Sequence, residues 1–247
     1  MTFIEFLNED RRTNLSLEEA VKIFKEKCSN SNLDRPFIRN ARSYNLFSVV
    51  TAKGNVRTRQ SGNNLSKVVV DKLMKDKYGK DAPLRSEATI FATNKAIHTF
   101  LFGGQEYYVF PFNDTDVAYI ESEDFNYSDE VDHGVYNLLN TCRILHRNVE
   151  SYGDVIAHFK KEFGTVENMI EKNHSFFNKF SNKYDINKIK TFEDFVDQSH
   201  NLDLLKIHVV KGGDKIDQSK RYECWASGPC LVVHKSVFKE FKNVILS

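Results

Sequence analysis

The residues of this sequence best suited to chemistry are charged side chains that stand beside short apolar segments. Glu223 directly precedes the apolar run Cys224–Ala226, an unusual neighbour for a carboxylate. Arg39 follows an apolar pair in a segment that begins at a proline, and its guanidinium is suited to holding a phosphate or a ribose through paired hydrogen bonds. Taken alone, an arginine in such a strand is most often simply exposed, and Arg42 offers the same chemistry nearby.

A second set of polar residues lies around the stretch from residue 85 to residue 112. Arg85 and Ser86 precede a strand that is predicted over Ala88–Thr93 from its β-branched and aromatic residues. A helix is predicted over Asn94–Phe102, because asparagine is a good N-cap and the glycine pair that follows supplies the backbone conformation that ends helices. An aromatic strand is predicted next, over Glu106–Phe112.

This stretch resembles the second motif region of ADP-ribosyltransferase-like proteins, particularly a group encoded by tailed phages. The shared form is Arg-Ser, then Phe-Ala-Thr, a short helix, a glycine, and Tyr-x-Val-Phe-Pro. In that family an arginine lies on an early strand and a glutamate on a late strand, and Arg39 and Glu223 stand in these positions in the expected order. The segment Val56–Arg59 also resembles an arginine-containing element that precedes a helix in the phage group.

The resemblance implies a catalytic site formed by Arg39, Thr93 and Glu223. In the family, the late-strand glutamate hydrogen-bonds the ribose 2′-hydroxyl and stabilises the cation that forms as nicotinamide leaves. The residues implied to bind NAD are Arg39, Arg57, Arg59, Arg85, Ser86, Thr89 and Phe91, with Phe91 or a nearby tyrosine stacking on nicotinamide. The usual Ser-Thr-Ser of the family is Phe91-Ala92-Thr93 here, so which hydroxyl acts stays open.

The function that the resemblance implies is cleavage of the glycosidic bond of NAD and transfer of ADP-ribose to an acceptor. The acceptor would be a host protein or nucleic acid, and the protein would be a phage product acting in the host bacterial cytoplasm. Arg221 stands two residues before Glu223, where enzymes that modify arginine carry Glu or Gln, so another acceptor, or no acceptor at all, is favoured over arginine. The alternative is a binding protein that keeps the fold, lacks catalysis, and interacts with a host or virion partner.

For the fold, the resemblance implies an α+β domain with a split, mostly antiparallel pair of β-sheets around an NAD cleft. We expect a single domain over residues 1–247, with an N-terminal helical segment at residues 1–34 and a helical insertion at about residues 131–206. Ser16 and Glu19 have the spacing of a capping box and predict a helix start. Further strands are predicted at residues 35–42, 45–51, 116–120, 206–210, 221–226 and 230–234, the last two joined as a hairpin.

The predicted insertion is rich in phenylalanine, with lysines between the aromatic residues. Its phenylalanines are Phe159, Phe163, Phe176, Phe177, Phe180, Phe192 and Phe195. Aromatic residues with interleaved lysines form nucleic-acid surfaces in some proteins. More often such phenylalanines are the core of a helical subdomain whose lysines are solvated. We expect the second arrangement here, with the insertion acting as a cap that selects the target.

The composition is that of an ordinary globular protein, with 40% hydrophobic residues, 28% charged residues and a net charge of +1. Such a balance argues against a protein that wraps nucleic acid. No phosphate-binding glycine loop is present, and neither the 8 histidines nor the 4 cysteines have metal-ligand spacing, so no metal is expected. No apolar run approaches the length of a membrane span, so we expect no membrane association.

Overall fold

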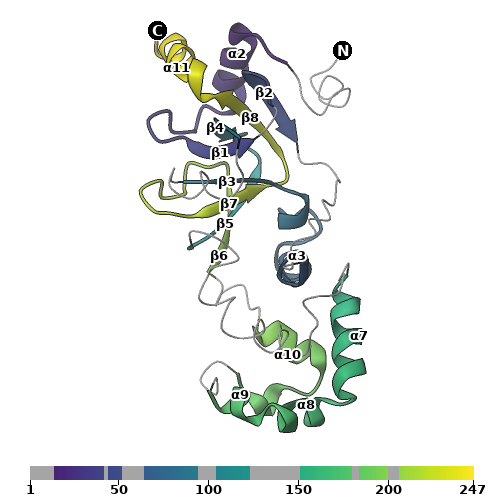
Figure 1. Ribbon diagram of the computed structural model, residues 1–247. Coiled ribbons are helices and arrows are strands. Elements are labelled where there is room, and N and C mark those ends of the chain that lie inside the picture. The colour runs from purple at the N-terminus through teal and green to yellow at the C-terminus, as the bar shows by residue number, and fades with distance from the viewer. Residues whose placement is uncertain are drawn as a thin grey trace. The chain divides into compact units, whose positions relative to one another are not determined.

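The computed structural model describes residues 14–41, 44–51, 64–93, 104–122, 151–179, 184–199 and 206–247 (Figure 1). The chain divides into two compact units. The sheet unit comprises Met1–Val56, Ala82–Asp124 and Ile207–Ser247, and the helical unit comprises Arg57–Asp81 and Phe125–Lys206. The helical unit therefore includes residues 57–81 in addition to the segment expected as an insertion.

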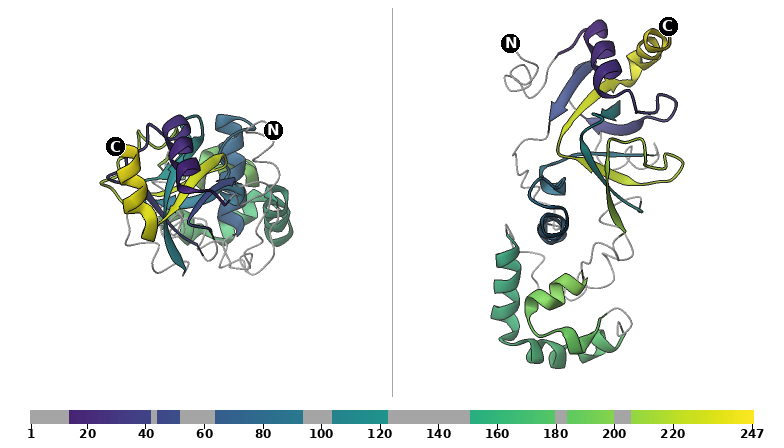
Figure 2. Two further views of the ribbon diagram at one scale, coloured as in Figure 1. Left: turned by 90° about the horizontal axis from the view of Figure 1, so that it is seen from above. Right: turned by 180° about the vertical axis from the view of Figure 1, so that it is seen from behind.

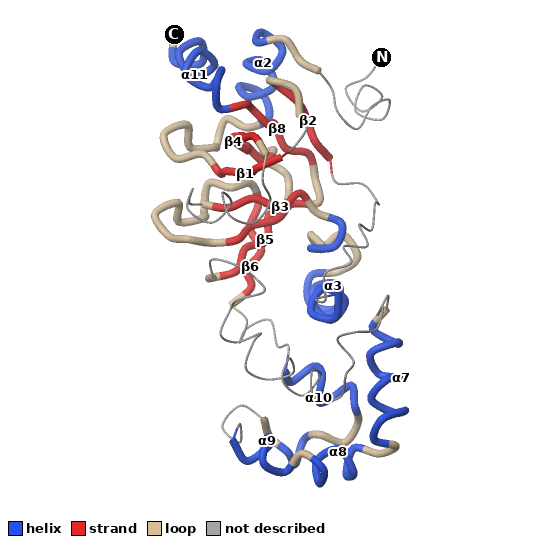
Figure 3. Tube along the Cα trace, in the orientation of Figure 1, coloured by secondary structure: helices blue, strands red, loops and turns tan. Residues whose placement is uncertain are grey.

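The sheet unit is built on one antiparallel sheet of eight strands among the described residues, coloured red in Figure 3. The strands are β1 (Phe37–Ala41), β2 (Phe47–Thr51), β3 (Thr89–Ala92), β4 (Gln105–Pro111), β5 (Asp116–Ile120), β6 (Ile207–Lys211), β7 (Glu223–Ala226) and β8 (Pro229–His234). Their order is β2-β8-β4-β1-β3-β7-β5-β6, and every pairing is antiparallel. The α+β class and the antiparallel sheet are confirmed, whereas the expected pair of sheets is one continuous sheet.

The predicted hairpin between the last two strands is wrong. β7 pairs with β3 and β5, while β8 pairs with β2 and β4. The turn between β7 and β8 is bound to the segment between β4 and β5. The Pro229 carbonyl accepts hydrogen bonds from Phe112 N (3.1 Å) and from Thr115 Oγ1 (3.2 Å). A Cβ on Gly228 would lie 2.7 Å from that same hydroxyl, so only glycine fits here. After this turn, β8 lies between β2 and β4 and not beside β7.

Helices α2 (Leu17–Lys27) and α11 (Phe238–Leu246) lie side by side against one face of the strands at the β2 end of the sheet (Figures 1 and 2). The capping box predicted at the start of α2 is confirmed. Ser16 Oγ accepts a hydrogen bond from Glu19 N at 3.2 Å, and the Glu19 carboxylate accepts one from Ser16 N at 2.8 Å. Phe24 of α2 packs edge-on against Phe110 and Phe241, with ring centroids 5.2 and 5.7 Å away. Burial of these rings holds both helices on the sheet.

The opposite face of the sheet carries a second buried core. Residues directly opposite each other in an antiparallel pair share a face, so Phe91 of β3 and its partner Cys224 of β7 lie on the same side. Both are fully buried, together with Val109 and Val232. Phe91 meets Phe37 of β1 edge-on at 4.9 Å, which joins the middle strands of the sheet on this side.

The helical unit consists of five described helices and a short 3-10 helix, Ile186–Lys188. The helices are α3 (Asn64–Tyr78), α7 (Tyr152–Phe163), α8 (Val166–Lys172), α9 (His174–Lys179) and α10 (Phe192–Ser199). Ser151 and Asp154 form a capping box at the start of α7, and Gly164, with a φ of 74°, ends that helix. No strand occurs in the described part of this unit, in agreement with the helical pattern of its sequence.

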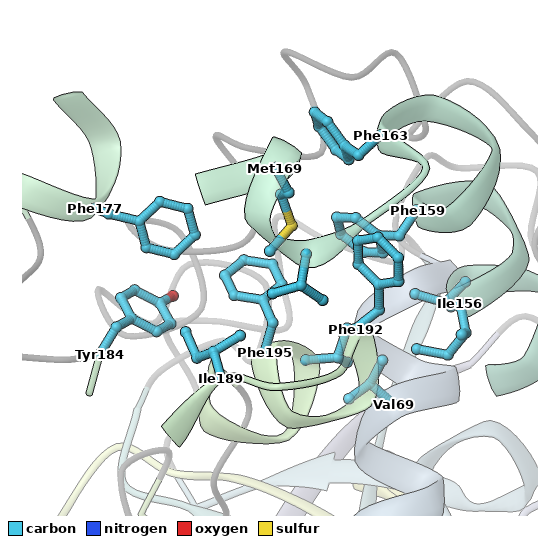
Figure 4. Packing of buried hydrophobic residues seen from close by; sticks show 13 residues of the cluster. Val69, Ile156, Phe159, Phe163, Met169, Phe177, Tyr184, Ile189, Phe192 and Phe195 are labelled. Carbon is cyan, nitrogen blue, oxygen red and sulfur yellow. The ribbon is translucent and has the colours of Figure 1, made fainter. Parts of the chain in front are cut away.

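The phenylalanines of this unit form its core (Figure 4). Those that are buried are Phe159, Phe163, Phe177, Phe192 and Phe195, while Phe176 is half-buried and Phe180 lies outside the described residues. Val69 of α3 belongs to the same cluster, which explains why residues 57–81 group with this unit. The prediction that these aromatic residues are core rather than a nucleic-acid surface is confirmed for the buried ones.

Substitution of Phe195 tests how far this core stabilises the helical unit. The Phe195 ring is fully buried and lies 5.6 to 5.7 Å, centroid to centroid, from Phe159, Phe177 and Tyr184. Phe195→Ala removes these contacts and leaves a cavity, so we expect a loss of about 3–5 kcal/mol in the free energy of unfolding. Urea unfolding, monitored through hydrogen exchange of the α7 and α10 amides, measures this loss in the free energy of unfolding. Leu246→Ala, at a residue 67% exposed, is the control; an equal loss in both variants would contradict the assignment.

Candidate functional site

The candidate site is a buried ion pair between Glu223 and Arg85. Glu223 is the first residue of β7, and Arg85 begins the short 3-10 helix η1 (Arg85–Glu87) that precedes β3. Arg85 Nε donates a hydrogen bond to Glu223 Oε1 at 2.7 Å, and the two side chains are only 4% and 7% exposed. A charge-assisted hydrogen bond of this length in a dry environment is strong, and removal of either partner takes this bond from a buried charged group.

β7 holds the segment before β3 at a second point. Trp225 is two residues after Glu223, so both side chains lie on the same face of β7. The Trp225 indole is fully buried and donates a hydrogen bond to the Pro83 carbonyl at 2.8 Å. The carboxylate and the indole together fix the segment that leads into η1. Glu223 has an apolar neighbour on each side in the sheet, because its direct partners in the two neighbouring strands are the buried residues Ala92 and Ile120.

Thr93 holds the backbone that leads into Glu223. Its hydroxyl accepts a hydrogen bond from Tyr222 N at 2.8 Å and donates a short one to the Lys220 carbonyl. The Thr93 amide also donates to the Tyr222 carbonyl at 3.2 Å. Glu223 N in turn donates to the Ser122 carbonyl at 3.0 Å. Thr93, predicted as a catalytic hydroxyl, therefore positions Glu223 through the preceding residues.

Arg39 does not join Glu223 in this structure. In the register of the sheet, Ile38 lies opposite Ala92, and Ala92 lies opposite Glu223, so these three share one face. Arg39, one residue along β1, lies on the other face because side chains alternate along a strand. Its Nη1 donates to the Ile90 carbonyl at 2.6 Å, and its guanidinium carbon lies 5.8 Å from the centre of the Tyr44 ring. The prediction that Arg39 and Glu223 form one site is therefore wrong for this structure. The arginine that contacts the Glu223 carboxylate is Arg85.

The remaining predicted NAD-binding residues are placed as follows. Phe91 is fully buried against Phe37, so stacking on nicotinamide is not available to it in this arrangement. Thr89 is buried on the same face as Phe91, opposite Ala226. Ser86 lies within η1, next to Arg85. Arg57 and Arg59 lie outside the described residues.

Cysteine chemistry and a metal centre find no support in the described residues. Burial raises the pKa of Cys28 and Cys224 well above that of a free thiol and raises the pKa of Cys230 to about 12, so these thiols stay protonated and unreactive. No group of three or more His, Cys, Asp or Glu side chains suited to a metal ion occurs among the described residues. No helix in the described part of the chain combines the length and the apolar character needed to cross a membrane.

The pairing of Arg85 with Glu223 was missed by sequence reasoning, which assigned Arg85 only to NAD binding. The two residues are 138 positions apart, and no local pattern joins them. The one available signal was Glu223 itself, because a carboxylate beside an apolar strand needs a buried cation or a set of donors.

Comparison of the chain with protein-family models, with curated proteins and with solved structures gave no match. The resemblance to ADP-ribosyltransferase-like proteins therefore depends on the order of the sequence motifs alone.

The strength of the ion pair is measurable through stability. Arg85→Met removes the arginine from the buried Glu223 carboxylate, and we expect a loss of about 3–5 kcal/mol in the free energy of unfolding, part of which returns in the Arg85→Met/Glu223→Gln double variant. Trp225, the one tryptophan of the chain, lies beside the pair and reports urea unfolding of the sheet unit by fluorescence.

The matched control is the ion pair between Lys211 and Asp116 in the same sheet, at 2.9 Å, in which the side chains are 64% and 31% exposed. Because water screens exposed pairs, Lys211→Met should cost no more than about 1 kcal/mol. If Arg85→Met were as stable as Lys211→Met, the buried pair would contribute no more to the free energy of unfolding than the exposed pair does.

Proposed function

We propose that this protein cleaves the glycosidic bond between nicotinamide and ribose in NAD and transfers ADP-ribose to an acceptor, with Glu223 as the catalytic carboxylate. The observation that carries the proposal is the buried Glu223 side chain at a strand end, held by Arg85 at 2.7 Å between the apolar strand partners Ala92 and Ile120. A carboxylate fixed in a dry site stabilises a nearby developing cation far more than one in water. The order of the sequence motifs supports the same chemistry.

In the proposed reaction, the Glu223 carboxylate accepts a hydrogen bond from the ribose 2′-hydroxyl and stabilises the cationic ribose as the bond to nicotinamide breaks. Arg85 orients the carboxylate, and Thr93 orients the backbone before it. Because the Glu223 side chain is only 7% exposed, the ribose must share or replace the contact made by Arg85. We therefore propose that NAD binding weakens the Arg85–Glu223 hydrogen bond.

The proposed acceptor is a protein or nucleic acid of a bacterial host, and the proposed setting is the cytoplasm of a cell infected by a tailed phage. The resemblance of the motifs to the phage group supports this setting. Arg221, two residues before Glu223, favours an acceptor other than an arginine side chain.

A second candidate function is binding without catalysis. Two observations favour it: Arg39 lies on the face opposite Glu223, and Phe91 is closed inside the core. Two contacts expected for NAD are then lacking, and the ion pair of Glu223 serves only to hold η1 on β7. In this case the protein binds a host or virion partner and catalyses no reaction.

Glu223→Gln separates the two functions. We expect hydrolysis of NAD, or transfer of labelled ADP-ribose to proteins or nucleic acid in a bacterial lysate, to fall at least about 100-fold, because the neutral amide no longer stabilises the cation. Glu106→Gln is the matched control: Glu106 lies in β4 of the same sheet and pairs with Lys235 at 3.2 Å. Its rate should stay within about threefold of the wild type, because it lies away from the proposed chemistry.

Equal rates for the wild type and Glu223→Gln would reject the role of Glu223. A wild-type protein that neither hydrolyses NAD nor transfers ADP-ribose would favour the binding function.

A further inference from the structure

Two side chains of β7 bind the segment that leads into η1, and they do so in matched order. Glu223 binds Arg85 at 2.7 Å. Trp225, two residues later in β7, binds the carbonyl of Pro83, two residues before Arg85, at 2.8 Å. The later residue of β7 thus holds the earlier residue of the segment, so the segment runs antiparallel to β7. Both contacts lie on the face of the sheet that carries Glu223, because side chains two residues apart in a strand share a face.

η1 has little of its own to fix its position. It is three residues long, and its N-cap, Leu84, makes no side-chain capping hydrogen bond. The hydrogen bond from Glu87 N to the Leu84 carbonyl, at 3.1 Å, closes its turn. A single turn of this kind is marginal by itself, because few hydrogen bonds offset the entropy lost when the backbone is ordered. The position of Arg85 therefore depends on contacts between the neighbouring residues and the rest of the sheet unit.

The indole of Trp225 provides such a contact at Pro83. Proline has no N–H group, so its carbonyl is the backbone group through which a hydrogen bond can hold it. Ala82, Pro83 and Leu84 are buried, and the Trp225 side chain is fully buried. A hydrogen bond in such a dry environment is costly to lose, because water does not replace the missing donor. A shift of Pro83 would also move Arg85, which follows two residues later.

We infer that Trp225 is a positioning residue for Glu223 and acts through Pro83 and Arg85. The indole fixes Pro83, Pro83 fixes the start of η1, and Arg85 then sets the orientation of the Glu223 carboxylate. The inference rests on the proposed function, in which this carboxylate stabilises the ribose cation. A displacement of about 1 Å at a reacting group costs up to about 100-fold in rate, so support of this kind belongs to the chemistry.

The test removes the hydrogen-bond donor while keeping a ring of the same shape. Trp225 is the one tryptophan of the chain, so a tryptophan auxotroph supplied with an analogue replaces it at this position alone. Benzothienylalanine has the shape of tryptophan but carries sulfur in place of the indole N–H. A ring-fluorinated tryptophan keeps the N–H and is the control for the labelling. Trp225→Phe is a second variant that lacks the donor.

The first readout is the NMR signal of the Arg85 Nε–H group in the full chain. With benzothienylalanine we expect this signal to move upfield, because the hydrogen bond to Glu223 lengthens. The ring-fluorinated chain should keep the wild-type position. Tyr152→Phe removes another side-chain hydrogen bond of 2.8 Å, to Asp197 in the helical unit, and should leave the Arg85 signal unchanged. This readout needs no NAD.

The second readout is the kinetics of NAD cleavage, compared where urea unfolding followed by circular dichroism shows each chain to be folded. The benzothienylalanine chain and Trp225→Phe should lose about tenfold in kcat, with KM within about twofold of the wild type. A displaced carboxylate weakens stabilisation of the transition state more than it weakens binding of the substrate. A purely structural role of the indole would leave kcat of the folded chains unchanged.

Two results would overturn the inference. One is an Arg85 signal that stays at the wild-type position in both chains that lack the donor, even if these chains cleave NAD. The other is a shifted Arg85 signal with an unchanged kcat, because the position of Arg85 would then not matter to the carboxylate. A wild-type protein that cleaves no NAD would reject the proposed function, and the Arg85 signal would still decide whether Trp225 positions Arg85.

Discussion

The hydrogen bond between Arg85 and Glu223 is the interaction on which the arrangement of the sheet unit depends most. Taking two charges out of water costs several kcal/mol per ion, and only close pairing and further hydrogen bonds offset that cost. Here Arg85 pairs closely with the carboxylate, and the hydrogen bond from Trp225 to the Pro83 carbonyl fixes the segment that carries Arg85. The same contacts fix the first residue of β7 and the entry to β3, two neighbouring central strands of the sheet. The contacts that stabilise the sheet therefore also fix the position of the Glu223 carboxylate.

The alternation of side chains along the strands separates two surfaces with different chemistry. Glu223 and Trp225 lie on one face, where the ion pair offers electrostatic stabilisation. Arg39 and Phe91 lie on the other. Thr93 binds Tyr222, one residue before Glu223, and so fixes the backbone that carries the carboxylate.

Much of the local structure followed from the sequence, because it depends on short-range chemistry. The capping box at Ser16 and the strand Asp116–Ile120 were predicted with the boundaries that the structure has, and the burial of phenylalanines such as Phe195 was predicted from their helical spacing. The predictions that failed concern contacts between residues that are far apart in the sequence. The turn at Gly228 has the composition of a hairpin, but its contacts to Thr115 direct β8 elsewhere. The face of Arg39 depends on strand register, and the partner of Glu223 lies 138 residues away, which no local pattern reveals.

The proposed reaction requires NAD to reach Glu223 by weakening the hydrogen bond between Glu223 and Arg85. The most direct measurement is the NMR signal of the Arg85 Nε–H group in the full chain, recorded with and without a non-hydrolysable NAD analogue. We predict a signal shifted downfield by the 2.7 Å hydrogen bond, absent at that position in Glu223→Gln, and moving upfield as the analogue saturates the protein. An Arg85 signal that stays unchanged at saturating analogue would contradict this role for Glu223.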